Sequence, residues 1–349
     1  MTSSLENDNF IRACWRKETD YTPVWFMRQA GRYLESYRKI RAQHDVLEIC
    51  KTPKLAAQIT VEAAQELGVD AAIIFADIML PIEGAGIGLK IVDGGPQIEK
   101  PVRNNDDKVL ERLESFAPEQ DVPYVLETTR LVKSNLDDGI PVIGFSGAPF
   151  TLASYLIEGG PSRDFTETKR IMYDQSEFWN SLLSHLSNMV SSYLLAQIHA
   201  GVDAVQLFDS WSGCLSPVDY EEFVLPHTKR IFQQLEGRGV PRIHFGVGTA
   251  GLLSDMRGTQ SDVYGVDWRI PIDEAWKLLG DDNVAIQGNL DPATLLSNWT
   301  LVESRTTKIL SSVKGRRGHV FNLGHGVLPG TDPLQLKKLV RLVQRTTRR

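Results

Sequence analysis

The sequence contains little cysteine: Cys14, Cys50 and Cys214 are the only three in 349 residues. An odd number of widely spaced cysteines argues against a disulfide framework and supplies no CxxC metal clip. No apolar run approaches the length of a membrane span, and the first residues, MTSSLENDNF, lack the apolar segment of a secretory signal. We therefore expect a cytoplasmic protein with reduced thiols and no membrane partner.

The sequence also lacks a basic excess, because its formal net charge is -6. This balance gives no reason to expect nucleic acid as a partner, so an anionic substrate would need a local cluster of cations. The one basic stretch is the C-terminal end, where apolar residues recur at helical spacing between the cations. Leu336, Leu339, Val340 and Val343 predict a terminal helix whose basic face is solvated.

Several catalytic signatures are missing as well. There is no GxGxxG after a strand, no GxxxxGK[ST] and no GxSxG, and the glycines of residues 84–88 are too closely spaced to form either nucleotide-binding loop. His244-Phe245-Gly246 lacks the cysteine that a thiolate zinc site of the HxC type would need. The sequence therefore predicts no nucleotide cofactor and no metal.

Eight short apolar segments are spread along the chain, each ending where polar residues or glycine begin. They are nearly continuously hydrophobic, which is typical of parallel strands buried on both faces. The segments are Val24–Met27, Ala71–Phe75, Pro141–Phe145, Ala204–Phe208, Arg242–Phe245, Val263–Val266, Val284–Gln287 and His319–Asn322.

Helical patterns lie between these segments. Pro53 to Leu67 starts with proline, keeps one apolar face and stops at Gly68, and a longer pattern runs from about Ser176 to His199. Leu89–Val92, followed by Asp93-Gly94-Gly95, predicts a hairpin after the second strand. The count of eight favours a single-domain (β/α)8 barrel over residues 1–349 rather than an open sheet.

Barrel active sites lie where the strands end, so polar residues after each apolar segment are the candidates. The first segment delivers Arg28 and Arg32, whose planar guanidinium groups suit carboxylates or phosphates. Each candidate also has a structural explanation: an ion pair for the arginines, a helix cap for an aspartate or serine, and core packing for a tyrosine or histidine. The further candidates are Asp77, Tyr155, Ser210 and His325, the last of which lies between two glycines.

Seven blocks of sequence together resemble the uroporphyrinogen decarboxylase family. They follow one another through nearly the whole chain, which makes the resemblance specific although each block alone would be moderate. The blocks are PVWFMRQAGRY at 23–33, IIFADI at 73–78, GFSGAPFTLASYLIEGG at 144–160, QLFDSWSG at 206–213, GVDW at 265–268, QGNLDP at 287–292 and NLGHG at 322–326. A local departure is Glu35-Ser36, where the family often has Pro-Glu.

The resemblance implies a distorted (β/α)8 barrel, usually a homodimer, that works without metal or organic cofactor. It implies decarboxylation of the four acetate side chains of uroporphyrinogen III to methyl groups, giving coproporphyrinogen III and four CO2 in haem biosynthesis. Carried over by motif, the catalytic residues would be Asp77, Arg28 and Arg32. The substrate-binding residues would be Arg28, Gln29, Ala30, Gly31, Arg32, Asp77, Tyr155, Ser210 and His325.

The candidate residues suit the decarboxylation that the resemblance implies. Such a substrate carries eight carboxylates for Arg28 and Arg32 to bind, and a protonated pyrrole can serve as its own electron sink. We hypothesise that ionised Asp77 accepts hydrogen bonds from the pyrrole N–H groups and stabilises the cationic ring. Two alternatives stay open: a zinc-dependent corrinoid methyltransferase on the same barrel, and a porphyrinogen carrier without turnover.

Overall fold

A curled parallel sheet forms the centre of the computed structural model, which describes residues 8–92, 95–103, 106–137, 139–280 and 283–349. Seven strands lie in the order β1-β4-β5-β6-β7-β8-β9, and every neighbouring pair is parallel. This order confirms seven of the predicted strands. The strands are β1 (Ala72–Ile73), β4 (Val142–Gly147), β5 (Ala204–Asp209), β6 (Arg242–Gly246), β7 (Val263–Gly265), β8 (Ala285–Leu290) and β9 (His319–Leu323).

The eighth predicted strand, Val24–Met27, is wrong as a regular strand. Val24 forms a single parallel bridge to Phe321 of β9, and its carbonyl accepts the N–H of Asp70 just before β1. The segment thus closes the barrel between β9 and β1 without a ladder. Side chains take its other donors: Asp70 Oδ2 accepts the N–H of Val24 at 2.8 Å, and Asn322 Oδ1 accepts that of Met27 at 3.3 Å. The fold is accordingly a distorted (β/α)8 barrel.

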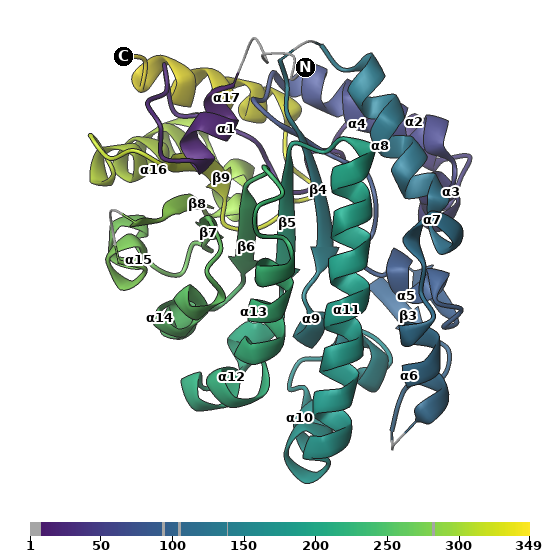
Figure 1. The fold of residues 1–349 in the computed structure, drawn as a ribbon. Coiled ribbons are helices and arrows are strands. Elements are labelled where there is room, and N and C mark those ends of the chain that lie inside the picture. Colours follow the sequence, from purple (N-terminus) through teal and green to yellow (C-terminus); the bar gives the residue numbers. More distant parts are fainter. Residues whose placement is uncertain (1–7, 93–94, 104–105, 138, 281–282) are drawn as a thin grey trace.

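Helices cover the outside of the sheet, and its strands run from the end carrying α1 and α17 toward the end carrying α9, α10 and α12 (Figure 1). Predicted helix bounds hold closely, since α4 spans Pro53–Leu67 and α11 spans Ser176–Ala200. The remaining helices are α1 (Asn9–Cys14), α2 (Glu35–Arg41), α3 (Val46–Lys51), α5 (Leu80–Gly84), α6 (Asp107–Glu114), α7 (Pro118–Asp121), α8 (Pro123–Asn135), α9 (Pro149–Glu158), α10 (Thr166–Asp174), α12 (Pro217–Phe223), α13 (Leu225–Gln234), α14 (Leu253–Met256), α15 (Ile272–Leu278), α16 (Trp299–Ser312) and α17 (Pro333–Thr346).

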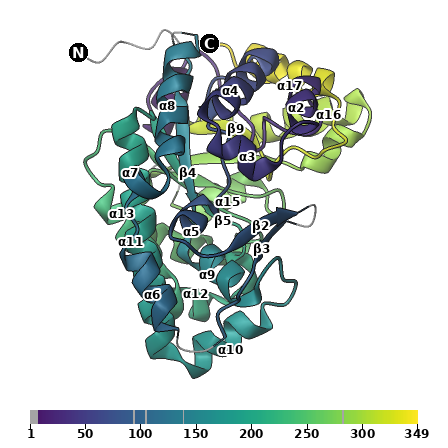
Figure 2. The same ribbon diagram turned by 90° about the vertical axis from the view of Figure 1, so that its right-hand side faces the viewer.

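The predicted hairpin is present after β1. Strand β2 (Leu89–Val92) pairs antiparallel with β3 (Gly95–Ile98), while the turn residues Asp93 and Gly94 lie outside the described residues. The N–H of Ile98 donates to the carbonyl of Gly159, which follows α9. Figure 2 shows the hairpin beside α5 and α9. The hairpin is therefore fixed at the carboxyl end of the strands.

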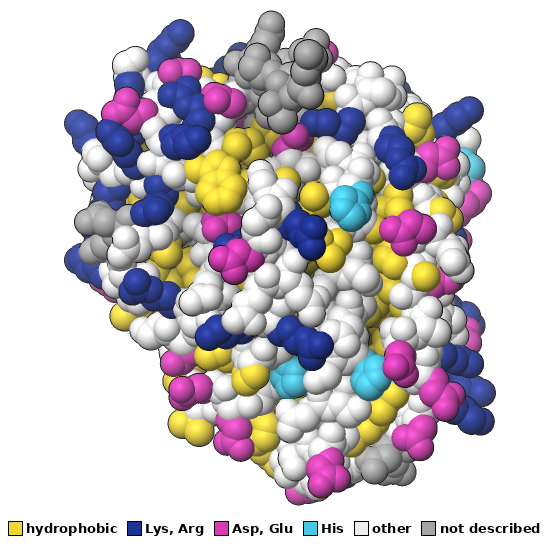
Figure 3. Space-filling view, in the orientation of Figure 1, with side chains coloured by type: hydrophobic (Ala, Val, Ile, Leu, Met, Phe, Trp, Pro, Cys, Tyr) yellow, Lys and Arg dark blue, Asp and Glu magenta, His cyan; other side chains and the backbone are white. Residues whose placement is uncertain are grey.

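The basic C-terminal helix matches its prediction. In α17, Leu336, Leu339, Val340 and Val343 are buried, whereas Lys338, Arg341 and Arg345 are exposed, as is Arg348 just after the helix. Lys and Arg side chains are frequent on the surface over α16 and α17 (upper left of Figure 3). This amphipathic division holds the helix on the barrel and leaves the basic face in solvent.

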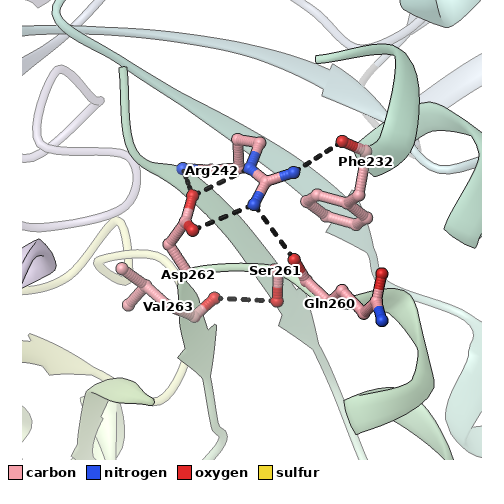
Figure 4. A network of polar contacts seen from close by, with 6 residues as sticks. All are labelled: Phe232, Arg242, Gln260, Ser261, Asp262 and Val263. Atoms are coloured by element: carbon pink, nitrogen blue, oxygen red, sulfur yellow. Dashed lines mark hydrogen bonds and ion pairs between the residues drawn. The ribbon is translucent and has the colours of Figure 1, made fainter. Parts of the chain in front are cut away.

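One arginine, Arg242, forms a network of polar contacts at the end of the barrel where β6 and β7 begin. Arg242 binds both carboxylate oxygens of Asp262 at 2.8 and 2.9 Å and donates to the carbonyl oxygens of Phe232 and Gln260 (Figure 4). The side chains of Arg242 and Asp262 are only 13% and 18% exposed. Because the pair is bidentate and shielded, it should contribute more than a surface ion pair.

Asp262→Ala should lower the free energy of unfolding by about 2–3 kcal/mol, because Arg242 would keep its charge in a shielded place without its carboxylate. Chemical denaturation measures this change. Lys39→Ala is the control, since it removes an ion pair to Glu35 whose side chains are 73% and 72% exposed. That control should change the stability by no more than about 0.5 kcal/mol, and equal effects of the two substitutions would contradict the prediction.

Candidate active site

A cavity of about 460 Å³ opens at the carboxyl end of the strands. This is the end at which barrel enzymes place their catalytic residues. The cavity is lined by Met27, Arg28, Gln29, Ala30, Ile73, Ile74, Phe75, Ala76, Asp77, Ile78, Gly95, Pro96, Phe145, Tyr155, Pro161, Phe208, Ser210, Trp211, Phe245, Val247, His325 and Gly326.

Most of the predicted site residues meet at this cavity. Arg28, Gln29 and Ala30 lie on one side of it, and the other predicted residues that line it are Asp77, Tyr155, Ser210 and His325. Of the residues that the structure describes, Gly31 and Arg32 were predicted at the site but do not line the cavity. Arg32 is exposed on the same loop, which places it outside the cavity wall.

Gln29 stabilises the loop in which it lies, which also carries Arg28 and Ala30. Its side chain is buried, its Oε1 accepts the N–H of Phe26, and its Nε2 donates to the carbonyl of Ala71. The hydroxyl of Tyr33 in turn donates to the carbonyl of Gln29. These bonds tie the arginine-bearing loop to the chain entering β1, so the side chain of Gln29 holds Arg28 and Ala30 in place.

Arg28 is held in an uncommon backbone conformation beside a glycine that gives its side chain room. Its φ of 57° lies in the left-handed region, where non-glycine residues are rare and cluster at functional sites. A Cβ on Gly326 would lie 2.4 to 3.1 Å from the Arg28 side chain, and one on Gly324 would lie 2.4 Å from the backbone nitrogen of Trp268. The two glycines around His325 are therefore explained by Arg28 and by the neighbouring loop.

Asp77 follows β1 and faces the cavity. Its Oδ1 accepts the N–H of Met79 at 2.9 Å, so it braces the turn before α5 without being the cap residue, which is Met79. Within the described chain no other residue donates a hydrogen bond to its side chain. Burial raises the pKa of Asp77, while the Met79 N–H and the charge of Arg28 act to lower it.

Tyr155 and His325 are neutral hydrogen-bonding groups at pH 7. Burial, with the negative charge of Asp77, raises the pKa of Tyr155 to about 12, so its hydroxyl keeps its proton. Burial, with the positive charges of Arg28 and Arg269, lowers the pKa of His325 to about 4. Among the residues that line this cavity, Arg28 and Asp77 are then the groups that can carry a charge near neutral pH.

Three phenylalanines form an apolar row that the sequence reasoning missed. Phe145 and Phe208 have ring centroids 5.4 Å apart, Phe208 and Phe245 are 5.8 Å apart, and Phe245 lies 6.4 Å from the ring of His325. They come from three neighbouring strands, β4, β5 and β6. The signal was in the sequence, because each of these three predicted strands ends in phenylalanine.

A cation, a carboxyl group and a row of aromatic rings line one cavity at the carboxyl end of the barrel. Together they define the class of protein, a (β/α)8-barrel enzyme with a site for a large, mostly apolar molecule that carries carboxylates. A model of the family described as uroporphyrinogen decarboxylase (URO-D) matches residues 5–346. The chain belongs to this family.

Individual relatives agree with the family match. Proteins named uroporphyrinogen decarboxylase from Sorangium cellulosum and Carboxydothermus hydrogenoformans are 50% and 48% identical to this chain, and each alignment covers 97% of the chain and 96% of the relative. Among solved structures, a methyltransferase from Methanosarcina mazei superposes with a TM-score of 0.81 and 17% identity over 99% of both chains. At that identity the likeness supports the barrel fold alone.

Two kinds of feature are absent from the described residues. They contain no group of three or more His, Cys, Asp or Glu side chains placed to hold a metal ion. No helix in the described ranges combines the length and apolar character that a membrane span requires. The zinc-dependent methyltransferase alternative thus has no ligand set in this part of the chain.

Proposed function

We propose that this protein removes CO2 from the four acetate side chains of uroporphyrinogen to give coproporphyrinogen. The observation that carries the proposal is the placement of Asp77 and Arg28 at one cavity, beside a row of aromatic rings, in a chain of this family. A flat macrocycle with a rim of carboxylates matches these three elements: apolar area for the rings, a cation for a carboxylate, and a carboxylate for the pyrrole N–H groups.

The reaction supplies its own electron sink. Protonation of a pyrrole ring carbon creates a cation, into which the electrons of the C–C bond flow as CO2 leaves. A proton then adds to the exocyclic carbon to form the methyl group, and the ring carbon loses the first proton. Each cycle consumes one proton and releases one CO2.

The site residues take complementary parts in this scheme. Asp77, ionised, accepts hydrogen bonds from pyrrole N–H groups and stabilises the cationic ring. Arg28 binds the carboxylate of the reacting acetate, and Arg32, exposed on the same loop, binds a carboxylate farther out. Tyr155, Ser210 and neutral His325 hydrogen-bond the substrate from the other strands.

An anaerobic assay of purified protein with uroporphyrinogen tests the function. We expect release of four CO2 per substrate and formation of the tetracarboxylate product. Tight binding without CO2 release would instead support the carrier. Stoichiometric zinc in the purified protein, together with absence of decarboxylation, would support the methyltransferase.

We also propose that the chain works as a single domain, as a homodimer and in the cytoplasm. The family resemblance supports the dimer, and the three scattered cysteines support a reducing compartment. Sedimentation of the purified protein tests the oligomeric state: a mass of twice 39.0 kDa is expected. Sedimentation at the mass of one chain would contradict the homodimer.

Activity should depend on pH through Asp77. Because burial raises its pKa, protonation should begin at a higher pH than for an ordinary aspartate, and kcat/KM should fall as the pH drops through that raised value. His325, with a pKa lowered to about 4, should add no loss between pH 6 and 7. Initial rates across pH 4.5–9 for the parent and for His325→Gln measure both effects. An acid limb near pH 6.5 that disappears in His325→Gln would contradict this assignment.

A further inference from the structure

Arg269 is a cation that has no role in the reaction proposed above. It follows β7 in the segment Val266–Arg269, its Nη1 donates to the carboxylate of Asp267, and its guanidinium stacks 4.1 Å from the ring centroid of Trp268. Asp267 is buried, whereas the side chain of Arg269 is 49% exposed. The guanidinium is therefore positioned by two contacts and still reaches solvent.

The segment that carries Arg269 lies between two loops of the cavity. Asp267 Oδ2 accepts the N–H of Gly248 at 2.8 Å, next to cavity-lining Val247. On the other side, Gly324 packs so closely on Trp268 that a Cβ there would lie 2.4 Å from the Trp268 nitrogen. Gly324 directly precedes cavity-lining His325. Arg269 thus belongs to a segment that packs against both of the cavity-lining loops that follow β6 and β9.

The electrostatic effect on His325 agrees with this position. The positive charge of Arg269, like that of Arg28, lowers the pKa of His325, whereas Asp267 acts to raise it. Two cations therefore act on one residue that lines the cavity. Among the described residues, Asp267 is the only carboxylate paired with Arg269.

A purely structural ion pair is the competing explanation. It accounts for the bond to Asp267, but that carboxylate already accepts two backbone N–H groups, from Gly248 and from Arg269 itself. It does not require a half-exposed guanidinium held over an indole ring. The contacts with Trp268 and Asp267 restrict where the guanidinium can lie, and its half-exposed position leaves it accessible to a ligand; this is the preorganisation that carboxylate recognition uses.

We propose that Arg269 binds a peripheral carboxylate side chain of the substrate, on the His325 side of the cavity. The inference rests on the proposed function, because it concerns how that substrate is held. Arg269 is remote from the bond that breaks, so it binds ground state and transition state equally. Its removal should then raise KM and leave kcat nearly unchanged.

Arg269→Gln tests the proposal with the anaerobic uroporphyrinogen assay. The glutamine keeps a planar polar end but loses the charge. We expect KM to rise about 10-fold with kcat within about 2-fold of the parent, equivalent to about 1.4 kcal/mol of binding. The dependence of KM on salt should also become weaker, because one charge contact is gone. Arg269→Lys retains the charge without the planar fork, so its KM should lie between that of the parent and that of Arg269→Gln.

Arg316→Gln is the matched control. Arg316 also lies over a tryptophan, 5.2 Å from the ring centroid of Trp276, but it precedes β9 at the opposite end of the barrel. This control should keep the parent KM. A parent-like KM and salt dependence in Arg269→Gln would overturn the inference, as would a lower kcat with unchanged KM, which would indicate a structural role through Asp267. Absence of CO2 release by the parent would instead refute the proposed function.

Discussion

Asp77→Asn is expected to lower kcat by about 10³-fold while KM changes by less than about 5-fold. The size follows from losing a preorganised charge in a site shielded from water, which is worth several kcal/mol. The amide can keep the bond from the Met79 N–H, which Asp77 accepts at 2.9 Å, so the turn before α5 should persist. What is lost is the negative charge facing the cationic ring, and the amide N–H groups would oppose the pyrrole donors.

A matched control distinguishes the effect of losing the Asp77 charge from the effect of disturbing the turn before α5. Asp332 accepts the N–H of Leu334 at 2.9 Å in the same two-residue geometry, but it is exposed at the start of α17. Asp332→Asn should retain parent kcat and KM. Single-turnover rates with substrate in excess of KM measure the chemical step directly. Near-parent turnover by an Asp77→Asn protein that binds substrate normally would disprove the electrostatic role.

Local sequence signals predicted seven strands of the central sheet, the hairpin and three of the helices, α4, α11 and α17. Helix α4 has proline at its start and Gly68 at φ +68° at its end, and both are readable within one segment. The segment 24–27 shows where this reasoning stops. The N–H groups of Val24 and Met27 donate to Asp70 and Asn322, the second of which lies 295 positions along the chain from Met27. No periodicity within four residues could reveal those partners.

Two charged residues of the site could be predicted from the sequence, whereas its geometry could not. Arg28 and Asp77 were found from residue type after strand ends, and the structure places both at the cavity. The left-handed residue of the arginine loop is Arg28 itself, at φ 57°, and not Gly31, the glycine between the two arginines. Arg269 escaped notice because its significance depends on Gly324 and Gly248, which contact its segment only in the folded barrel.

Arg28→Ala is expected to lower kcat/KM by about 10²- to 10³-fold with an unchanged far-ultraviolet spectrum and melting temperature. Alanine and arginine have a similar conformational free-energy cost in the left-handed region, so the substitution neither adds nor removes backbone strain at φ 57°. The guanidinium, by contrast, is lost from the cavity together with its contact to the reacting carboxylate. Turnover equal to the parent would leave Arg28 a structural residue.

Gly326→Ala reaches the same guanidinium by a second route and tests whether its position matters. The new Cβ would lie 2.4 Å from Cδ and 2.7 Å from Cγ of Arg28, so the side chain must move away from its site. We expect kcat/KM to fall about 10-fold or more, since small displacements of a positioned group are costly. In the Arg28→Ala background those two atoms are gone, and Gly326→Ala should then have little further effect. Additive losses in this double-mutant cycle would show that Gly326 acts independently of Arg28, because only residues that share one interaction deviate from additivity.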